Sequence, residues 1–333
     1  MKISASIYSN KEKSLEDLVR ELDAHGIDML HVDCADNDKV FDDIAAIRKF
    51  SSTPIDLHII SSTPEKYLQK IEELKIEYVS FQYENLTALP MLPKNTSTKF
   101  GLSVVSSTGI DVFEKAKGDY SFVVMMATTP GKSGGAFSRE IFQKIIAFKN
   151  RFPQTQIHVD GGVNDEIGFI LRLLGVHSIV SGSYLMNHES MGAGLLSFHK
   201  TKTESKSFTI SDFATPVPFL PILNSNADFK TILKTIDDFK FGFVLLVSET
   251  GTLEGVVSNA DIRRGLLKNS ADFNLVNTES IVNKNSISIQ SAATLSEMIK
   301  LVNELNFIVL FLPVVDEKNI LKGAVLLNNL TRV

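Results

Sequence analysis

The sequence predicts an α/β fold: a (β/α)8 TIM barrel, followed by a smaller α+β unit. Two observations support the barrel. Short apolar runs typical of buried strands alternate with amphipathic helical patterns, and eight such strands precede residue 199. The third observation is the length of 333 residues, which predicts more than one domain. An open doubly wound sheet is disfavoured, because no dinucleotide-binding glycine pattern follows the first strand.

The eight predicted strands lie at regular intervals, with helical patterns between them. The strands are Ile3–Tyr8, Met29–Asp33, Ile55–Ile60, Tyr78–Gln82, Phe100–Val105, Phe122–Met126, Ile157–Asp160 and Ser178–Ser181. The first helical pattern opens at Ser14 as a cap and closes at Gly26, and a later one begins at Pro64, a residue permitted in a first turn. A further helix is predicted over 138–148, where apolar residues form one stripe.

Composition excludes several classes of protein. The net charge of −5 and the lack of a basic stripe argue against nucleic-acid binding. No apolar run approaches the roughly 18 residues that span a bilayer, and we see no signal peptide, so no membrane partner is expected. The single cysteine, Cys34, fits a reducing compartment, and its place in the strand suggests packing. We therefore expect a cytoplasmic protein.

Four polar side chains stand at the ends of three predicted strands. Side chains alternate along a strand, so His31 and Asp33 point the same way. Asp56-Leu57-His58 and the run ending at Asp160 repeat the pattern on two further strands. In a (β/α)8 barrel these ends meet at one face, where the chemistry lies. Two imidazoles and two carboxylates suit a divalent transition metal such as zinc, iron, manganese or cobalt.

Glycines cluster after the last three strands, and the loops after strands seven and eight are where such barrels commonly bind phosphate through backbone amides. Each glycine alone could be a turn residue, but their shared position favours a phosphate site. The candidate phosphate-binding residues are Gly134, Gly135, Gly161, Gly162, Gly182 and Ser183.

These motifs together resemble the ribulose-phosphate 3-epimerase family over residues 1–199. The motifs are His31-Val32-Asp33, Asp56-Leu57-His58, Val124-Met125-Met126 leading to Pro130-Gly131 and Gly134-Gly135, Val159-Asp160-Gly161-Gly162-Val163, and Val180-Ser181-Gly182-Ser183. The resemblance implies that His31, Asp33, His58 and Asp160 bind the metal, that Asp33 and Asp160 exchange protons with the substrate, and that Ser6 lies near it. The chain departs from the family at Gln82, where a His is usual, and in the loop after Asp36.

The C-terminal part begins after a polar linker at 200–206. Beyond it, a helix, a strand, a turn and a second strand occur twice, over about 207–273 and 274–333, which indicates an internal repeat. This part resembles a tandem pair of CBS domains, the module named after cystathionine β-synthase. The resemblance implies an adenine-nucleotide site at Ser258 and Asp261. The second copy has Leu and Asn at the matching positions, and a pair that only dimerises or docks is an equal alternative.

The resemblance implies a metal-dependent epimerase that converts D-ribulose 5-phosphate to D-xylulose 5-phosphate, or acts on a close relative. Inverting a carbon beside a ketone needs one group to remove a proton and a second to return one on the opposite face, through an enediolate. Adenine nucleotide at the CBS pair would regulate it, and we expect a homo-oligomer. The alternative is a non-catalytic sensor that binds a sugar phosphate, with the CBS pair as its output or docking module.

Overall fold

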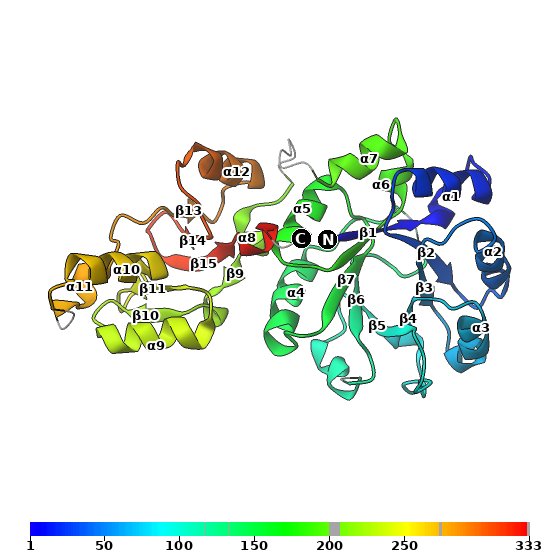
Figure 1. Cartoon of the computed structure of the whole chain (residues 1–333), viewed down its shortest axis with the longest axis horizontal. Coiled ribbons are helices and arrows are strands. Elements are labelled where there is room, and N and C mark those ends of the chain that lie inside the picture. The colour runs from blue at the N-terminus through cyan, green and yellow to red at the C-terminus, as the bar shows by residue number, and fades with distance from the viewer. Residues whose placement is uncertain (117, 133, 200–206, 273–274, 332–333) are drawn as a thin grey trace. The chain divides into compact units, whose positions relative to one another are not determined.

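The structure is a computed structural model that describes residues 1–116, 118–132, 134–199, 207–272 and 275–331. The linker predicted at 200–206 lies outside the described residues. The chain divides into two compact units, which we call the barrel unit (1–199) and the C-terminal unit (207–331). Figure 1 shows the two units with their elements labelled.

The barrel unit contains a closed barrel of eight parallel strands in sequence order, as predicted. Each strand pairs with its neighbours along the chain, and β1 closes the barrel against β8. The strands are β1 (Lys2–Ser6), β2 (Met29–Cys34), β3 (Ile55–Ile59), β4 (Tyr78–Gln82), β5 (Lys99–Val105), β6 (Phe122–Met126), β7 (Gln156–Asp160) and β8 (Ser178–Ser181). Their bounds agree with the predicted strands to within a few residues.

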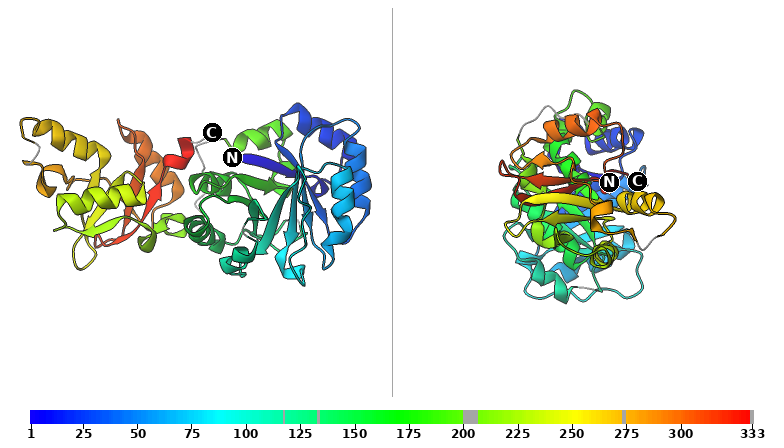
Figure 2. Two further views of the ribbon diagram at one scale, coloured as in Figure 1. Left: turned by 60° about the horizontal axis from the view of Figure 1, so that its bottom comes forward. Right: turned by 90° about the vertical axis from the view of Figure 1, so that its left-hand side faces the viewer.

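Helices surround the strands of this barrel (Figures 1 and 2). The α-helices are α1 (Leu15–Ala24), α2 (Lys39–Ile47), α3 (Leu68–Glu73), α4 (Glu140–Arg151), α5 (Asp165–Leu173), α6 (Ser183–Met186) and α7 (Met191–Ser197). The 3-10 helices are η1 (Ile7–Ser9), η2 (Pro64–Tyr67), η3 (Tyr83–Asn85) and η4 (Ile110–Lys115). The Ser14 side chain caps α1 by accepting from the Asp17 amide, and Gly26 ends it at φ +70°, so both predicted signals are confirmed.

Three predicted elements differ from the structure at their ends. The first strand stops at Ser6, because the chain turns into η1 where a strand was expected to reach Tyr8. The helix expected over 64–74 begins as η2 and continues as α3. The helix expected to begin at Ser138 starts at Glu140.

An apolar cluster packs together from three strands of the barrel. Met29, Tyr78, Phe122, Val124 and Met126 pack together from β2, β4 and β6. Because side chains alternate along a strand, Met29 shares its face with the residues two and four positions later. That face of β2 is therefore apolar at its start and polar at its carboxyl end.

The C-terminal unit is an α+β structure with a three-stranded sheet, β10-β11-β12, and a four-stranded sheet, β13-β14-β15-β9. Its strands are β9 (Thr215–Pro216), β10 (Ile222–Asn224), β11 (Phe243–Val247), β12 (Leu253–Ser258), β13 (Ile289–Gln290), β14 (Phe311–Val315) and β15 (Leu321–Leu326). Its helices are α8 (Ile210–Phe213), η5 (Val217–Phe219), α9 (Phe229–Phe239), α10 (Asn259–Lys268), α11 (Thr278–Ile281), α12 (Leu295–Glu304) and η7 (Asn328–Thr331).

The two sheets repeat one arrangement. In each, a short strand pairs parallel with a second strand, which pairs antiparallel with a third, and a helix lies between the first two along the chain. Even the register irregularity recurs, at Leu246/Val247 and at Val314/Val315. Phe243 and Phe311 stack with centroids 3.7 Å apart, joining the two copies.

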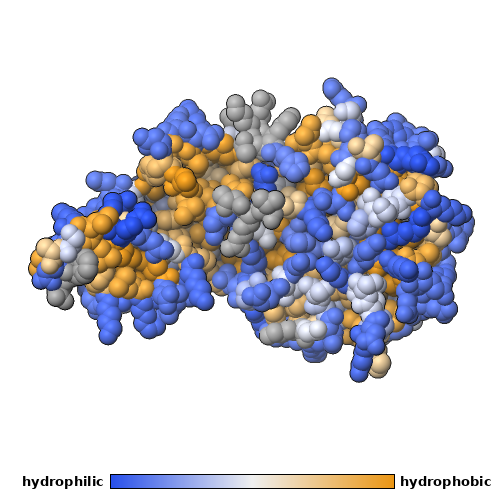
Figure 3. All heavy atoms as spheres, viewed as in Figure 1, coloured by the Kyte–Doolittle hydropathy of each residue, from blue (hydrophilic) through white to orange (hydrophobic). Residues whose placement is uncertain are grey.

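Several apolar side chains of the C-terminal unit are exposed. Phe307, Ile308 and Leu310, between α12 and β14, are 58, 85 and 53% exposed. Figure 3 shows hydrophobic side chains gathered around α10 and α12 on one face.

Across the described part of the chain, no helix combines the length and the apolar character that a membrane span needs. Formation of a homo-oligomer stays a prediction.

Candidate metal centre and active site

The four predicted metal ligands meet at the carboxyl ends of the strands. One potential ligand atom from each of His31, Asp33, His58 and Asp160 lies within 4.8 Å of the others. The register of β2 and β3 explains this, because His31 pairs with Asp56 and Asp33 pairs with His58. We call these four residues the ligand cluster.

A buried carboxylate orients the first imidazole. His31 Nδ1 lies 2.9 Å from Asp56 Oδ2, which also accepts a hydrogen bond from Ser4 Oγ at 2.9 Å. His31 Nε2 lies 3.4 Å from Asp33 Oδ1 and 3.8 Å from Asp160 Oδ2. This buried nitrogen has no hydrogen-bond partner of normal geometry among the described residues. It is therefore the atom of His31 that is turned toward the other ligands.

A neutral amide contacts the second imidazole. His58 Nδ1 lies 3.1 Å from Asp33 Oδ1, and His58 Nε2 lies 2.8 Å from Gln82 Oε1. His58 and Gln82 are both buried, at 0 and 1% exposure. Nδ1 is thus the atom of His58 that faces the ligand cluster.

The electrostatics separate the two aspartates of the cluster. Burial acts to raise the pKa of Asp33, but the positive charge of His31 and the contact with His58 outweigh it, so the pKa is well below its usual value. Burial raises the pKa of Asp160 to about 6, with His31 opposing and the negative charge of Asp33 adding to the rise. One carboxyl therefore stays ionised while the other takes a proton near neutral pH.

The neighbouring carboxylates also explain why the pKa of His31 is raised. Burial acts to lower the pKa of its imidazole, but Asp56 and Asp33 raise it well above the ordinary value. Carboxylates that favour a positive charge at this point also favour a bound cation there.

The donor set fits a divalent transition metal. Histidine ligands usually donate their second ring N–H to a carboxylate, carbonyl or amide oxygen. The contacts of His31 Nδ1 with Asp56 and of His58 Nε2 with Gln82 Oε1 are of this kind. The buried His31 Nε2 without a partner is the kind of atom that a metal would satisfy. Two imidazoles and two carboxylates suit zinc, iron, manganese or cobalt, and nothing in the set selects one.

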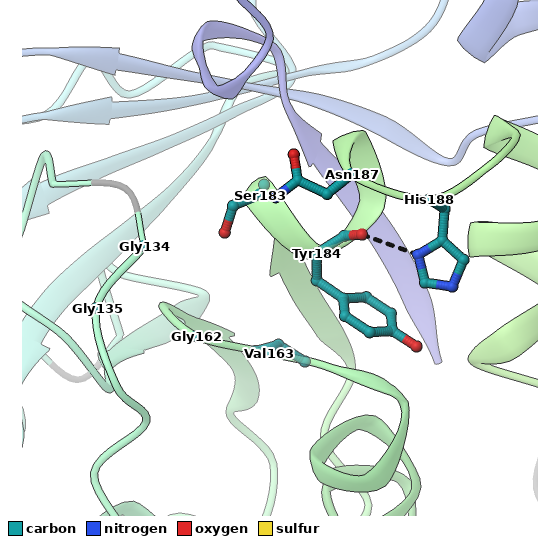
Figure 4. A pocket seen from close by; sticks show the side chains of 9 residues that line it. Gly134, Gly135, Gly162, Val163, Ser183, Tyr184, Asn187 and His188 are labelled. Atoms are coloured by element: carbon teal, nitrogen blue, oxygen red, sulfur yellow. Dashed lines mark hydrogen bonds between the residues drawn. The ribbon is translucent and has the colours of Figure 1, made fainter.

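Two cavities meet at the glycine-rich loops. The larger, of about 560 Å3, is lined by Ser6, Asp33, Asp160 and Gly161 among others. The smaller, of about 460 Å3, is lined by Gly135, Val163, Tyr184, Asn187 and His188 (Figure 4). Gly134, Gly162, Gly182 and Ser183 line both. All predicted phosphate-binding residues therefore border the cavity system that reaches Asp33 and Asp160.

Close backbone packing explains two of these glycines. Gly162 adopts φ +66°, and a Cβ there would lie 2.8 Å from the Gly135 carbonyl oxygen. A Cβ on Gly182 would lie 2.3 Å from Ser9 Oγ. These two positions let neighbouring segments of chain approach each other closely, and both glycines line the two cavities.

Four further side chains line the larger cavity near the start of α2. They are Tyr8, Asn37, Lys39 and Asp43. Tyr8 donates a hydrogen bond of 2.7 Å to Asp43 Oδ2. Cys34 is buried and contacts the Asn37 carbonyl oxygen through its sulfur, which is consistent with packing.

Two residues that contact the ligands were not predicted to do so. The sequence shows Asp56 only as part of the Asp56-Leu57-His58 motif and Gln82 only as a departure from the family pattern. Neither observation predicts a contact with an imidazole. Period-2 alternation places Asp56 on the same face as His58, which was the available signal. The contact of Gln82 with His58 depends on side-chain reach between β3 and β4, for which the sequence offers no pattern.

Ser258 and Asp261, the predicted nucleotide-binding residues, lie together at the start of α10 and form a capping box. Asp261 Oδ2 accepts from the Ser258 amide at 2.8 Å and from Ser258 Oγ. Asp261 Oδ1 accepts from Arg264. Both carboxylate oxygens therefore have partners from the same segment of chain.

The barrel and its ligand cluster define a class of protein: a (β/α)8 barrel with two imidazoles and two carboxyl groups gathered at the carboxyl ends of its strands, a donor set that fits a divalent cation. Residues 2–186 match the model of the ribulose-phosphate 3 epimerase family, more than half of the chain. The chain belongs to the ribulose-phosphate 3-epimerase family, and so to the isomerases.

Individual relatives carry the same name. The ribulose-phosphate 3-epimerase of Bacillus subtilis is 25% identical over 197 residues, 55% of this chain and 91% of that protein. The enzyme of Aquifex aeolicus is 28% identical over 182 residues, 50% of this chain and 82% of that protein. The enzyme of Methanocaldococcus jannaschii is 25% identical over 230 residues, which are 64% of this chain and 97% of that protein.

Solved structures of CBS domain pairs are similar to the C-terminal part. CBSX2, a CBS-pair protein from Arabidopsis thaliana, is 23% identical with a TM-score of 0.32, and covers 38% of this chain and 92% of its own. A CBS domain-containing protein from Bacillus anthracis is 11% identical with a TM-score of 0.32, and covers 37% and 90%.

Proposed function

We propose that this chain epimerises a ketose phosphate, converting D-ribulose 5-phosphate to D-xylulose 5-phosphate or acting on a close relative. The observation that supports this most is the pair Asp33 and Asp160, whose oxygens lie within 4.8 Å in one cluster and whose pKa values are shifted in opposite directions. Environments that separate two such pKa values are typical of acid and base partners.

The reaction needs both carboxyl groups. In one direction the ionised Asp33 takes the proton from the carbon beside the ketone, and the electron pair moves into the carbonyl to give an enediolate. The protonated Asp160 then returns a proton to the opposite face of that carbon, which inverts it. In the reverse direction the two residues exchange roles, since every step is reversible.

The metal would be held by His31 Nε2, His58 Nδ1 and oxygens of Asp33 and Asp160. When bound, it supplies a positive charge that stabilises the negative charge developing on the substrate oxygens. Asp56 and Gln82 keep the two imidazoles turned toward it, which lowers the cost of organising the site.

The phosphate would lie against the loops that contain Gly162 and Gly182, because both glycines line the two cavities. Figure 4 shows the loop at Gly162 beside Gly134 and Gly135. Backbone N–H groups bind a phosphate without adding net charge to the protein, which is consistent with the net charge of −5. Ser6 and Ser183 lie on the same cavity wall and offer hydroxyl groups to the sugar.

The test is exchange of the C3 proton with solvent deuterium, followed by NMR over a panel of pentulose and hexulose phosphates. We expect exchange and epimerisation with at least one of them. Asp33→Asn and Asp160→Asn should each reduce the rate by about 10²- to 10⁴-fold, the usual contribution of a general acid or base. Asp111→Asn is the matched control, because Asp111 is exposed and pairs only with Arg151 among the described residues.

Binding without exchange would contradict this proposal. A metal-free chain that binds a pentose phosphate but never exchanges its C3 proton would instead support the sensor. Gln82 and the altered loop after Asp36 depart from the family pattern. These departures are the reason for testing the sensor as a second function.

For the C-terminal unit we infer a regulatory adenine-nucleotide site at Ser258 and Asp261, by resemblance of their motif to the ribose-binding motif of CBS domains. A ribose would have to replace Arg264 at Asp261 Oδ1. Calorimetric titration with AMP, ATP and S-adenosylmethionine tests this directly. No heat with any of them would leave Ser258 and Asp261 with the capping role alone.

A further inference from the structure

The polar network around His58 continues one step beyond the ligand cluster. Gln82, the last residue of β4, is buried and its Oε1 lies 2.8 Å from His58 Nε2. Its amide nitrogen donates to Glu84 Oε2. A buried glutamine with one end on a candidate metal ligand and the other on a carboxylate invites a functional explanation.

Glu84 determines which end of the Gln82 amide faces His58. An ionised carboxylate can only accept hydrogen bonds, whereas an amide has a donor end and an acceptor end. The NH2 group of Gln82 must therefore face Glu84, and the carbonyl oxygen must face the imidazole. Reversing the amide would place two acceptors together on one side and two donors on the other.

Glu84 is itself fixed by the end of β5. Its Oε1 accepts from the Val105 amide at 3.0 Å and from the Thr108 hydroxyl. These contacts hold the carboxylate although the residue is exposed. The orientation of Gln82 is thus tied to the main chain of the neighbouring strand.

The consequence concerns the proton on His58. An acceptor oxygen faces each ring nitrogen of His58, Gln82 Oε1 at Nε2 and Asp33 Oδ1 at Nδ1, and a neutral imidazole carries only one hydrogen. A metal that engages Asp33 would leave Gln82 as the remaining acceptor, which favours the hydrogen on Nε2. The lone pair is then on Nδ1, which lies 3.1 Å from Asp33 Oδ1 inside the ligand cluster. A metal ligand must offer such a lone pair.

We propose that Gln82, oriented by Glu84, is a positioning residue that keeps the His58 proton on Nε2 and so presents Nδ1 to the metal. The inference rests on the proposed metal-dependent function and deepens it. Asp56 performs the matching task for His31, but as a buried carboxylate. A neutral amide at His58 gives the same orientation without a further negative charge beside Asp33, Asp56 and Asp160.

The experiment measures Zn²⁺ affinity of the full chain by competition with a chelator of known affinity. Gln82→Met replaces the amide by an apolar side chain of similar length, and we expect affinity to fall by about 10- to 100-fold, as for other partners of metal-bound histidines. Ser103→Ala is the matched control: Ser103 is buried, pairs with Gln82 across β4 and β5, and is not a member of the ligand cluster. The Zn²⁺ affinity of Ser103→Ala should equal that of the wild type.

A second readout distinguishes orientation from general damage. In the Zn²⁺-loaded wild type, ¹⁵N NMR of the histidine rings should find the His58 proton on Nε2. Glu84→Ala, at an exposed position, should fold even if Gln82→Met does not, and it should broaden or shift that signal and weaken Zn²⁺ binding. In both variants the melting temperature without metal checks the fold.

The outcomes separate this inference from the proposed function. A wild type that binds none of Zn²⁺, Fe²⁺, Mn²⁺ and Co²⁺ overturns both. A wild type that binds Zn²⁺ together with folded Gln82→Met and Glu84→Ala variants of equal affinity and unchanged His58 signal overturns the positioning role alone. C3 proton exchange with another metal would in that case still support the epimerase.

Discussion

The barrel unit and the C-terminal unit each contain a motif whose polar residues lie three or fewer positions apart, and they use those residues differently. In the C-terminal unit, Ser258 and Asp261 satisfy each other and the start of α10. In the barrel, His31 and Asp33 turn toward residues of other strands, and the buried His31 Nε2 has no hydrogen-bond partner among the described residues. The Ser258 and Asp261 motif stabilises its own helix, whereas the His31 and Asp33 motif leaves an atom for a ligand.

The difference has an energetic basis. A buried polar atom without a partner costs about 1–3 kcal/mol, so a fold retains it only when something else compensates. A capping residue has the opposite effect and stabilises its helix by about 1 kcal/mol. Whether a motif serves a ligand or the fold can thus be judged from which of its atoms have partners.

Among the variants that compare the two units, the largest effect is expected from removing the charge that orients His31. Asp56→Asn keeps an oxygen near His31 Nδ1 and Ser4 but loses the negative charge, so metal affinity should fall by about 10- to 100-fold. Chelator competition measures it. Asp261→Asn, the same change in the C-terminal unit, should leave the affinity unchanged, and a loss there would break the comparison.

A smaller effect is expected at the helix caps. Ser258→Ala should lower the free energy of unfolding by about 1 kcal/mol, because the hydroxyl caps α10 by accepting from the Asp261 amide. Thr294→Ala is the matched control, since Thr294 and Glu297 form the same capping box at α12. Denaturant unfolding compares them, and C3 proton exchange should not change in either.

A loss of AMP, ATP or S-adenosylmethionine binding in Ser258→Ala but not in Thr294→Ala would contradict a purely structural role. It would show that the motif in the C-terminal unit also serves a ligand. The comparison between the two units would then fail in favour of the regulatory site.

Much of this arrangement could be predicted from local patterns. Alternation along β2 placed His31 and Asp33 on one face, and the βα order placed Asp160 at the same end of the barrel. The partners of the imidazoles could not be predicted. The contact of His31 with Asp56 requires the register between β2 and β3, and that of His58 with Gln82 requires the rotamers of two buried side chains. Alternation shows only that Asp56 shares a face with His58, and no local pattern indicates that Gln82 contacts His58.

The smallest expected effect concerns Lys144 of α4, a polar group of the barrel that serves the fold. Its ammonium donates to the carbonyl oxygens of Val105 and Thr108, the segment that also anchors Glu84. Burial lowers its pKa to about 8. Between this value and the ordinary value near 10.5, the unfolded chain binds a proton that the folded chain has released, so stability contributed by Lys144 rises with pH over that interval.

Lys144→Met removes this titration. The free energy of unfolding of the wild type, relative to Lys144→Met, should therefore increase between about pH 8 and pH 10. We expect this change in the free energy of unfolding to be smaller than the effect of a helix cap, because the Lys144 side chain is partly exposed and water screens its charge. Urea unfolding at several pH values measures it, with Ser258→Ala as the variant whose difference from wild type should not change over this range. A constant difference for Lys144→Met would mean that its charge is as well solvated in the folded barrel as in the unfolded chain.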